Sequence, residues 1–182
     1  MPVLRHVTCS PMPWRNDMSE REIIMSPVTA VVGEMSLDPR RILLDTNVLL
    51  DYVDARRDEH VTAVELMHMA VARDLYLVAP ASSYKDLYYI LCRSLHSEER
   101  GRALLRKLVE CVPIAPLDLR GAYLAPASAG DEPDFEDGLV REIAERERVS
   151  TIITRDTAAF TGSSIPKFTP QEFLEVMGYV AG

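Results

Sequence analysis

The stretch that decides the fold is Arg41-Ile42-Leu43-Leu44-Asp45-Thr46-Asn47-Val48-Leu49-Leu50. Its apolar run at 42–44 is typical of a strand buried in a parallel sheet, and Thr46 and Asn47 suit the beginning of a helix. Asp45 is therefore expected at the C-terminal end of a strand, where open α/β sheets build their functional sites. An aspartate that only caps a helix would give the same local pattern, so the interpretation needs support from other parts of the chain.

Acidic residues recur at three later boundaries between predicted strands and helices. Asp86 lies in the first turns of a helix that follows the strand-like run 75–78. Asp134 and Asp137 open an amphipathic helical pattern, and Asp156 follows a β-branched run. Strands and helices alternate along the chain, which predicts a parallel α/β sheet. Carboxylates gathered at one edge of that sheet repel one another, so their clustering predicts bound divalent cations.

Each of these acids also fits a purely structural role. Asp134 is a natural helix N-cap with Asp137 at the third helical position, and Asp156 can cap a short helix. Asp86, in a first turn, interacts favourably with the helix dipole. Capping alone does not predict acids at the ends of successive strand–helix units, so we favour metal binding.

Taken in order, the acidic motifs are Asp45-Thr46-Asn47, Asp86 before Leu-Tyr-Tyr-Ile-Leu, Asp134-Phe-Glu-Asp137, and Thr154-Arg155-Asp156. They resemble the ordered motifs of PIN-domain nucleases, the family that includes the VapC-type toxins, over about residues 41–175. The resemblance implies a PIN-like three-layer α/β/α fold with a central parallel sheet. It also implies an endoribonuclease that depends on Mg²⁺ or Mn²⁺. Two positions depart from the family pattern: Asp86 stands where many relatives have Glu, and Gly138 where Ala is usual.

The roles of the acids follow from the resemblance and from the chemistry of phosphodiester hydrolysis, in which carboxylates hold hard cations. We assign Asp45 as the central metal ligand and Asp86 as a ligand or a base that holds the attacking water. Asn47 and Thr154 are expected to orient Asp45. The predicted catalytic residues are Asp45, Asp86, Asp137 and Asp156, and the predicted metal ligands are these four with Asp134.

A net charge of −8 argues against a nucleic-acid partner, because binding a polyanion depends on Lys and Arg. Neutralisation of four site carboxylates by metal would account for half of that charge. Arg56, Arg57 and Arg155 are the weak candidates for contacts with RNA phosphates. The basic run at 100–107 is interpreted as a solvated helix face, and Asp51 is expected to be solvated.

The chain divides into two regions by composition. Residues 1–40 are rich in proline and lack helix or strand periodicity, which predicts a poorly ordered N-terminal extension before a nuclease domain at 41–182. The natural protein is expected to begin near Met35. No apolar stretch approaches the roughly 18 residues of a membrane span, and no signal-peptide core is present, so we expect a cytoplasmic protein without membrane contact. The cysteines are expected to be reduced thiols.

The function favoured by this pattern is cleavage of single-stranded or structured RNA by the toxin of a type II toxin–antitoxin pair. A cognate antitoxin and a second copy of the chain are the expected protein partners. The homodimer rests on two apolar stripes, one at Tyr84, Tyr88 and Leu91 and one at Leu104, Leu105 and Leu108. Only one stripe can cover the sheet, so the other is expected to need a partner.

Two other classes of function remain open. One is a catalytically inactive PIN-like module that binds RNA or a protein. The other is a haloacid-dehalogenase-type phosphatase, which needs an acid two residues after its first aspartate, where this chain has Asn47.

Overall fold

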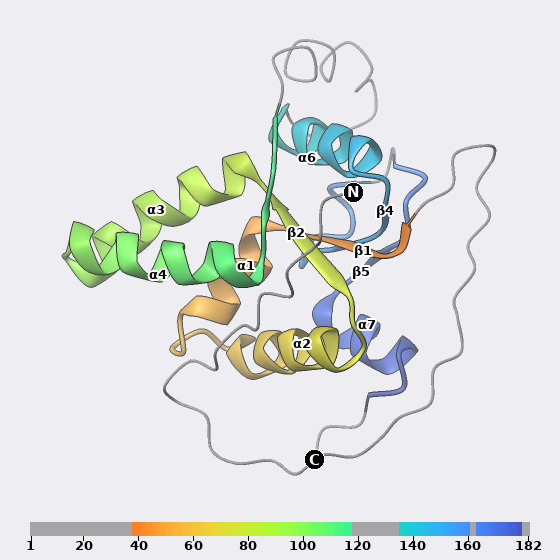
Figure 1. Ribbon diagram of the computed structural model, residues 1–182, viewed down its shortest axis with the longest axis horizontal. Helices are drawn as coiled ribbons and strands as arrows, with labels where there is room; N and C mark the ends of the chain where they lie inside the picture. Colours follow the sequence, from red (N-terminus) through yellow and green to blue (C-terminus); the bar gives the residue numbers. More distant parts are fainter. Residues whose placement is uncertain (1–37, 118–134, 161–162, 180–182) are drawn as a thin grey trace, which may run out of the picture.

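The computed structural model describes residues 38–117, 135–160 and 163–179. The predicted N-terminal extension, up to residue 37, and the candidate ligand Asp134 lie outside these residues. The described part has a central sheet with helices on both faces (Figure 1). The predicted α/β class and three-layer arrangement are confirmed.

Five parallel strands form the sheet in the order β3-β2-β1-β4-β5. They are β1 (Asp38–Leu44), β2 (Tyr76–Pro80), β3 (Ile114–Ala115), β4 (Val149–Ile153) and β5 (Lys167–Phe168). β1 lies in the centre and pairs with β2 on one side and β4 on the other. This position explains its continuous apolar run, because a central parallel strand is covered on both faces.

Helices connect the strands and cover the sheet. They are α1 (Thr46–Val53), α2 (His60–Ala72), α3 (Ala81–Leu95), α4 (Glu98–Cys111), α6 (Phe135–Arg146) and α7 (Pro170–Val176). Within the described segments, none of these helices combines the length and apolar character that a bilayer crossing requires. Cys92 is a free thiol, but Cys111 is disulfide-bonded, so the expectation of reduced thiols is wrong for Cys111.

Alternate residues of β1 contribute to two separate cores, as the two-residue period of a strand requires. Ile42 and Leu44 belong to the cluster formed with α1, α2 and α7, whereas Leu43 belongs to the cluster on the α6 face. The neighbouring strand repeats this division, because Leu43 is in register with Ile152 and Leu44 with Ile153. The two cores hold the C-terminal ends of β1 and β4 side by side.

Helices α3 and α4 pack against each other and extend away from the sheet as an arm (Figure 1). Tyr84, Leu91 and Leu108 are buried, so the prediction that one apolar stripe would lack a partner within the chain is wrong. The two stripes lie on helices that pack together, and the exposed apolar residues of α3 are instead Tyr89, at 62%, and Ile90, at 41%.

Candidate active site at the carboxyl edge of the sheet

Asp45 lies directly after β1 and begins α1. Its side chain caps the helix by accepting a hydrogen bond from the Thr46 backbone N–H at 2.6 Å to Oδ1. Its own N–H donates to the Ile153 carbonyl at 3.0 Å, which continues the pairing of β1 with β4. The end of the central strand and the first turn of the helix therefore fix this carboxylate, as the sequence predicted for its position.

Thr154 connects Asp45 to Asp156. Its buried hydroxyl donates to Asp45 Oδ2 at 2.9 Å and accepts from the Asp156 backbone N–H at 3.0 Å. The Thr154 N–H in turn donates to the Phe168 carbonyl at 3.0 Å. Strand β5, which has only two residues and no apolar run to reveal it in the sequence, thus helps to hold the hydroxyl that links the two acids.

Asp156 begins a turn after β4. Its Oδ1 accepts from the backbone N–H groups of Ala158 and Ala159 at 3.1 and 3.3 Å. Asp156 has this capping role and also lies close enough to Asp45 for their charges to interact. Burial raises the pKa of Asp45 above its ordinary value, and the negative charge of Asp156 adds to the rise, against the hydrogen bonds from Thr154 and the Thr46 N–H.

Asp86 lies in the second turn of α3, half-buried, with its Oδ1 3.0 Å from the ammonium of Lys85. Helix α3 is joined to the start of α1 by a hydrogen bond of 2.8 Å from the Thr46 hydroxyl to the buried Ser83 hydroxyl. Ser83 is not among the site residues predicted from the sequence. The available signal was a small hydroxyl in the first turn of the helix that carries Asp86.

Asp137 lies in the first turn of α6 and is half-buried. Helix α6 leads into β4, so its first turn lies toward the carboxyl edge of the parallel sheet. An electrostatic contact agrees with this placement: the hydrogen bond and charge of Asp86 raise the pKa of Lys85, and the charge of Glu136 contributes as well. Asn47 is exposed, and its side chain has no hydrogen bond to the described residues, so its orienting role stays a prediction.

No group of three or more His, Cys, Asp or Glu side chains is arranged to hold a metal ion in the part of the chain that the structure describes. The chemistry of Asp45 and Asp156 nevertheless fits a hard cation. Both supply carboxylate oxygens, and burial raises the pKa of Asp45, so its ionised form is disfavoured in the folded protein. A divalent cation held by these carboxylates would offset the cost of that buried negative charge.

Two of the three arginines predicted to contact RNA converge on Asp51. Arg57 Nε lies 2.5 Å and Arg155 Nη1 3.3 Å from Asp51 Oδ1. The Asp51 side chain is fully buried, so the expectation of a solvated residue is wrong. Its position six residues after Asp45 places it near the end of α1, on the side that the 154–156 turn covers.

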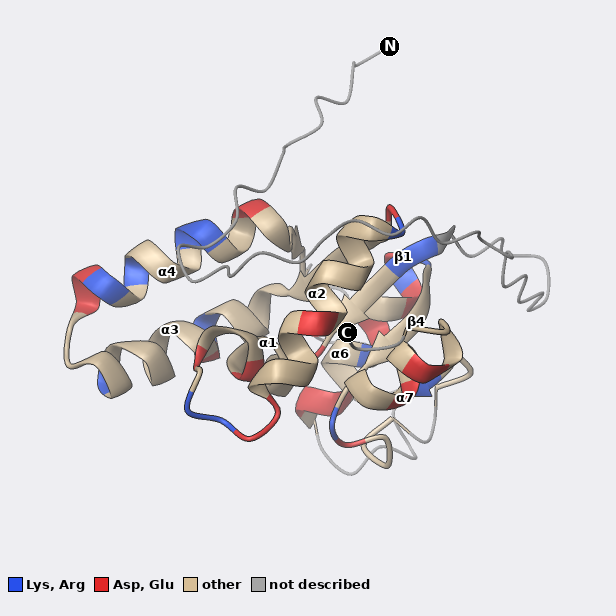
Figure 2. Ribbon diagram, turned by 90° about the horizontal axis from the view of Figure 1, so that it is seen from below, with Lys and Arg blue, Asp and Glu red and all other residues tan. Residues whose placement is uncertain are grey.

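The third candidate, Arg56, forms an ion pair at the end of α1. Its Nε and Nη2 both lie 2.7 Å from the carboxylate of Asp54, and Nη2 also donates to the Ser94 hydroxyl at 2.5 Å. Hydrogen bonds and charge from Arg56 lower the pKa of Asp54 to about 2. Arg56 therefore connects α1 to the α3–α4 arm. On α4, acidic residues lie toward both ends of the helix and basic residues lie between them (Figure 2), as expected for a solvated face.

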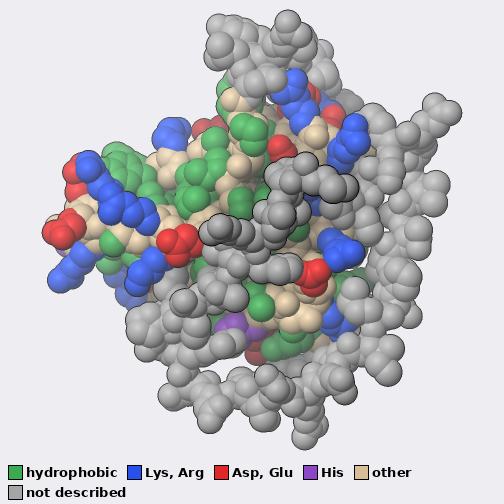
Figure 3. Space-filling view, in the orientation of Figure 1, with side chains coloured by type: hydrophobic (Ala, Val, Ile, Leu, Met, Phe, Trp, Pro, Cys, Tyr) green, Lys and Arg blue, Asp and Glu red, His purple; other side chains and the backbone are tan. Residues whose placement is uncertain are grey.

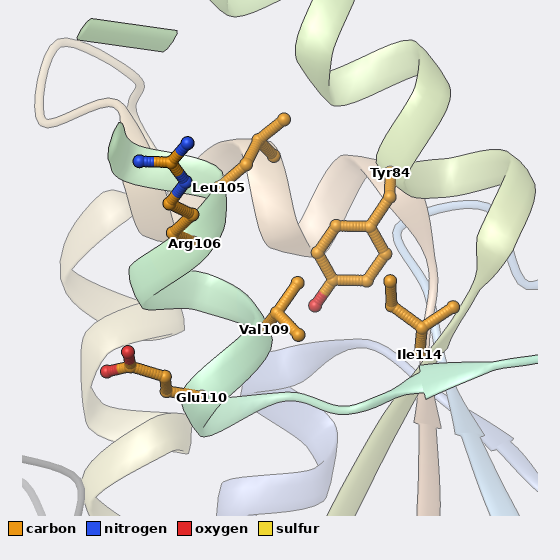
Figure 4. Close-up of a pocket in the computed structure, with 6 residues that line it drawn as sticks. All are labelled: Tyr84, Leu105, Arg106, Val109, Glu110 and Ile114. Carbon is orange, nitrogen blue, oxygen red and sulfur yellow. The ribbon is translucent and has the colours of Figure 1, made fainter. Parts of the chain in front are cut away.

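A mainly apolar pocket of about 460 Å³ lies between α3, α4 and β3 (Figure 4). Its lining residues are Tyr84, Leu105, Arg106, Val109, Glu110 and Ile114. The Tyr84 hydroxyl donates to the Val112 carbonyl, and burial raises the pKa of this phenol above its ordinary value. None of the candidate catalytic acids lines this pocket, so we assign it no part in the chemistry.

A parallel sheet with carboxylates after the adjacent strands β1 and β4 defines the class of open α/β proteins that build their sites at the carboxyl edge of the sheet. The family model described as PIN domain matches residues 41–158. The chain belongs to the PIN domain family. This membership rules out the haloacid-dehalogenase-type phosphatase.

Individual relatives are more distant. The chain is 22% identical over 142 residues to Ribonuclease VapC1 of Aquifex aeolicus (strain VF5), covering 76% of this chain and 96% of that protein. Its fold is similar to FitAcB from Neisseria gonorrhoeae, with a TM-score of 0.55, 23% identity, and coverage of 71% of this chain and 98% of that one. It is also similar to a toxin–antitoxin complex from Klebsiella pneumoniae, with a TM-score of 0.51, 20% identity, and coverage of 71% and 97%.

Proposed function

We propose that this protein is a Mg²⁺- or Mn²⁺-dependent endoribonuclease that acts in the cytoplasm as the toxin of a type II toxin–antitoxin pair. The observation that carries the proposal is the linked pair of acids at the carboxyl edge of β1 and β4, with the Thr154 hydroxyl between Asp45 and Asp156. Membership of the PIN domain family and likeness to a protein named as a ribonuclease support it.

In this proposal, Asp45 is the central metal ligand, and Asp137 and Asp156 supply further carboxylate oxygens. A bound divalent cation would lower the pKa of its water and stabilise charge on the phosphate and the leaving oxygen. Thr154 holds Asp45 in place by donating to one carboxylate oxygen. Asp86, on α3, either adds a ligand oxygen or accepts a proton from the attacking water.

Cleavage of single-stranded RNA by the full chain tests this function. We expect cleavage with Mg²⁺ or Mn²⁺, none in EDTA, and loss of activity in Asp45→Asn, which keeps a helix-capping oxygen and so preserves the start of α1. Asp58→Asn is a matched control, because it removes the same charge from an exposed position outside the site. Cleavage by the Asp45→Asn variant, or in EDTA, would reject the mechanism, and no cleavage under any metal would favour an inactive binding module.

We further propose that the chain forms a homodimer and binds a cognate antitoxin. The exposed Tyr89 and Ile90 on α3 support the dimer, since hydrophobic side chains reach the surface along the arm (Figure 3). The likeness to a toxin–antitoxin complex supports the antitoxin. Sedimentation at micromolar concentration should give a dimer that Tyr89→Ser weakens; a monomer in the unmodified protein would reject it.

The division into an N-terminal extension at 1–40 and a nuclease domain at 41–182 also remains a proposal. Strand β1 begins at Asp38, so residues 38–40 of the predicted extension belong to the sheet. Deletion of residues 1–34 should therefore leave a cooperative melting transition and RNA cleavage unchanged. Aggregation or a broadened transition would mean that the extension belongs to the folded core.

A further inference from the structure

A buried carboxylate connects the end of α1 to the turn that carries Asp156. Asp51 lies on α1, fully buried, and accepts from Arg57 Nε at 2.5 Å. It also accepts from Arg155 Nη1, at 3.3 Å to Oδ1 and 3.5 Å to Oδ2. A buried charge is costly unless it is paired, and here the pairing partners come from two separate segments. Asp51 therefore ties the 154–156 turn to helix α1.

Arg155 occupies a special position within that turn. It follows Thr154, which hydrogen-bonds Asp45, and it precedes Asp156. Its side chain is 43% exposed, and Asp51 is the only acceptor for its guanidinium among the described residues. A guanidinium carries five N–H donors in a planar fork, so several remain available to a ligand at the edge of the acidic site.

We propose that Asp51 is a positioning residue that holds Arg155 at the edge of the active site, where the guanidinium binds a phosphate of the RNA strand beside the one that is cleaved. The inference rests on the proposed ribonuclease function. Two arginines against one carboxylate leave a net positive charge next to carboxylates that would repel the RNA backbone. Anchoring by Asp51 reduces the rotamer freedom that Arg155 would lose on binding RNA.

This arrangement separates two contributions of one residue. The charge of Arg155 attracts the polyanion from any rotamer, whereas its fork binds a phosphate only when the guanidinium is held in place. Removing Arg155 abolishes both contributions. Removing the carboxylate of Asp51 abolishes only the second, and it does so without changing any group that contacts RNA.

The test measures cleavage of a single-stranded RNA by the full chain as a function of substrate and salt concentration. In Arg155→Ala we expect KM to rise about tenfold at nearly constant kcat. The slope of log kcat/KM against log salt concentration should become shallower by about one unit. In Asp51→Asn we expect a smaller rise in KM with the salt dependence retained. The double variant should be no worse than Arg155→Ala, because Asp51 acts through Arg155.

Further variants separate positioning from stability. Glu147→Gln breaks a half-buried pair with Arg41, in the middle of β1, and should leave KM unchanged. Arg155→Lys keeps the charge but not the fork and should resemble Asp51→Asn. Arg155 variants leave Asp51 paired with Arg57, so they test the proposal even if Asp51→Asn fails to fold.

Equilibrium binding of the same RNA in an Asp45→Asn background gives a readout that does not depend on cleavage. If the unmodified chain does not cleave RNA, the proposed function fails, while this binding series still decides the role of Arg155. Unchanged affinity and KM in Arg155→Ala would overturn the inference. Additive losses from Asp51→Asn and Arg155→Ala would also overturn it, because Asp51 would then act through the fold.

Discussion

The candidate active site has two halves that the protein holds in different ways. In the strand half, Asp45 and Asp156 follow adjacent strands and share the Thr154 hydroxyl. In the helix half, Asp86 lies on α3 beside an exposed Lys85. The strand half is fixed by hydrogen bonds to buried groups, whereas Asp86, among the residues that the structure describes, forms only an ion pair with the exposed Lys85. This comparison predicts that the chain alone fixes the strand half, and that Asp86 adjusts more readily when a cation or substrate binds.

The two halves also differ in electrostatics. Burial and the charge of Asp156 raise the pKa of Asp45, so the strand half carries an unfavourable negative charge. In the helix half, the ammonium of Lys85 already offsets part of the charge of Asp86. A bound cation should therefore interact more favourably with the carboxylates of the strand half than with Asp86.

The first prediction breaks the link within the strand half. Thr154→Val keeps the side-chain shape but removes the hydroxyl that donates to Asp45 and accepts from the Asp156 N–H. We expect RNA cleavage to fall about 10–100-fold, because groups that orient metal ligands have effects of that size. The free energy of unfolding should also fall by about 1–3 kcal/mol, because partners in a buried site lose their hydrogen bonds.

A matched control lies on the same strand. Thr151 is also buried, but its side chain has no hydrogen bond within the described residues, so Thr151→Val should leave cleavage unchanged. Equal loss of activity in the two variants would mean that repacking of β4, rather than the hydroxyl of Thr154, supports the site.

The second prediction compares the halves through metal binding. Mn²⁺ at about a hundred times its dissociation constant should stabilise the folded chain by roughly 2.7 kcal/mol. Calorimetric melting should show this shift reduced much more by Asp156→Asn than by Asp86→Asn. A larger effect of Asp86→Asn would place the dominant cation site in the helix half, and no shift with either Mn²⁺ or Mg²⁺ at millimolar concentration would reject the shared metal site.

The strand half was also the more predictable from the sequence. An apolar run that ends in an acid predicts a buried strand with the acid after it, so the positions of β1 and Asp45 followed from local pattern. Strand β5 and the buried state of Asp51 did not, because they depend on contacts between distant segments. Asp51 lies between apolar residues near the end of α1, and its pairing with Arg57 and Arg155 makes burial tolerable.

The third prediction concerns the cost of the buried charge at Asp45. In EDTA at neutral pH, Asp45→Asn should raise the melting temperature by about 2–4 °C, the size of a 1 kcal/mol effect in a chain of this length. Because the pKa of Asp45 is raised in the folded state, its ionised form opposes folding. The gain should therefore be complete above the folded pKa and disappear as the pH falls to the ordinary value of 3.8. A gain that persists unchanged below pH 3.8 would have a different cause.

The smallest effect is expected at Lys85, in the helix half. Lys85→Met removes the exposed ammonium 3.0 Å from Asp86 Oδ1, so the full charge of that carboxylate becomes available to a cation. We expect the Mg²⁺ concentration for half-maximal cleavage to fall by less than about fivefold, because exposed ion pairs are weak. Lys107→Met, on the exposed face of α4, is the control for loss of one positive charge and should leave the Mg²⁺ requirement unchanged. If Lys85→Met instead raises the Mg²⁺ requirement or weakens RNA binding, Lys85 contacts the substrate, and the helix half would be a substrate-binding element rather than an adjustable part of the metal site.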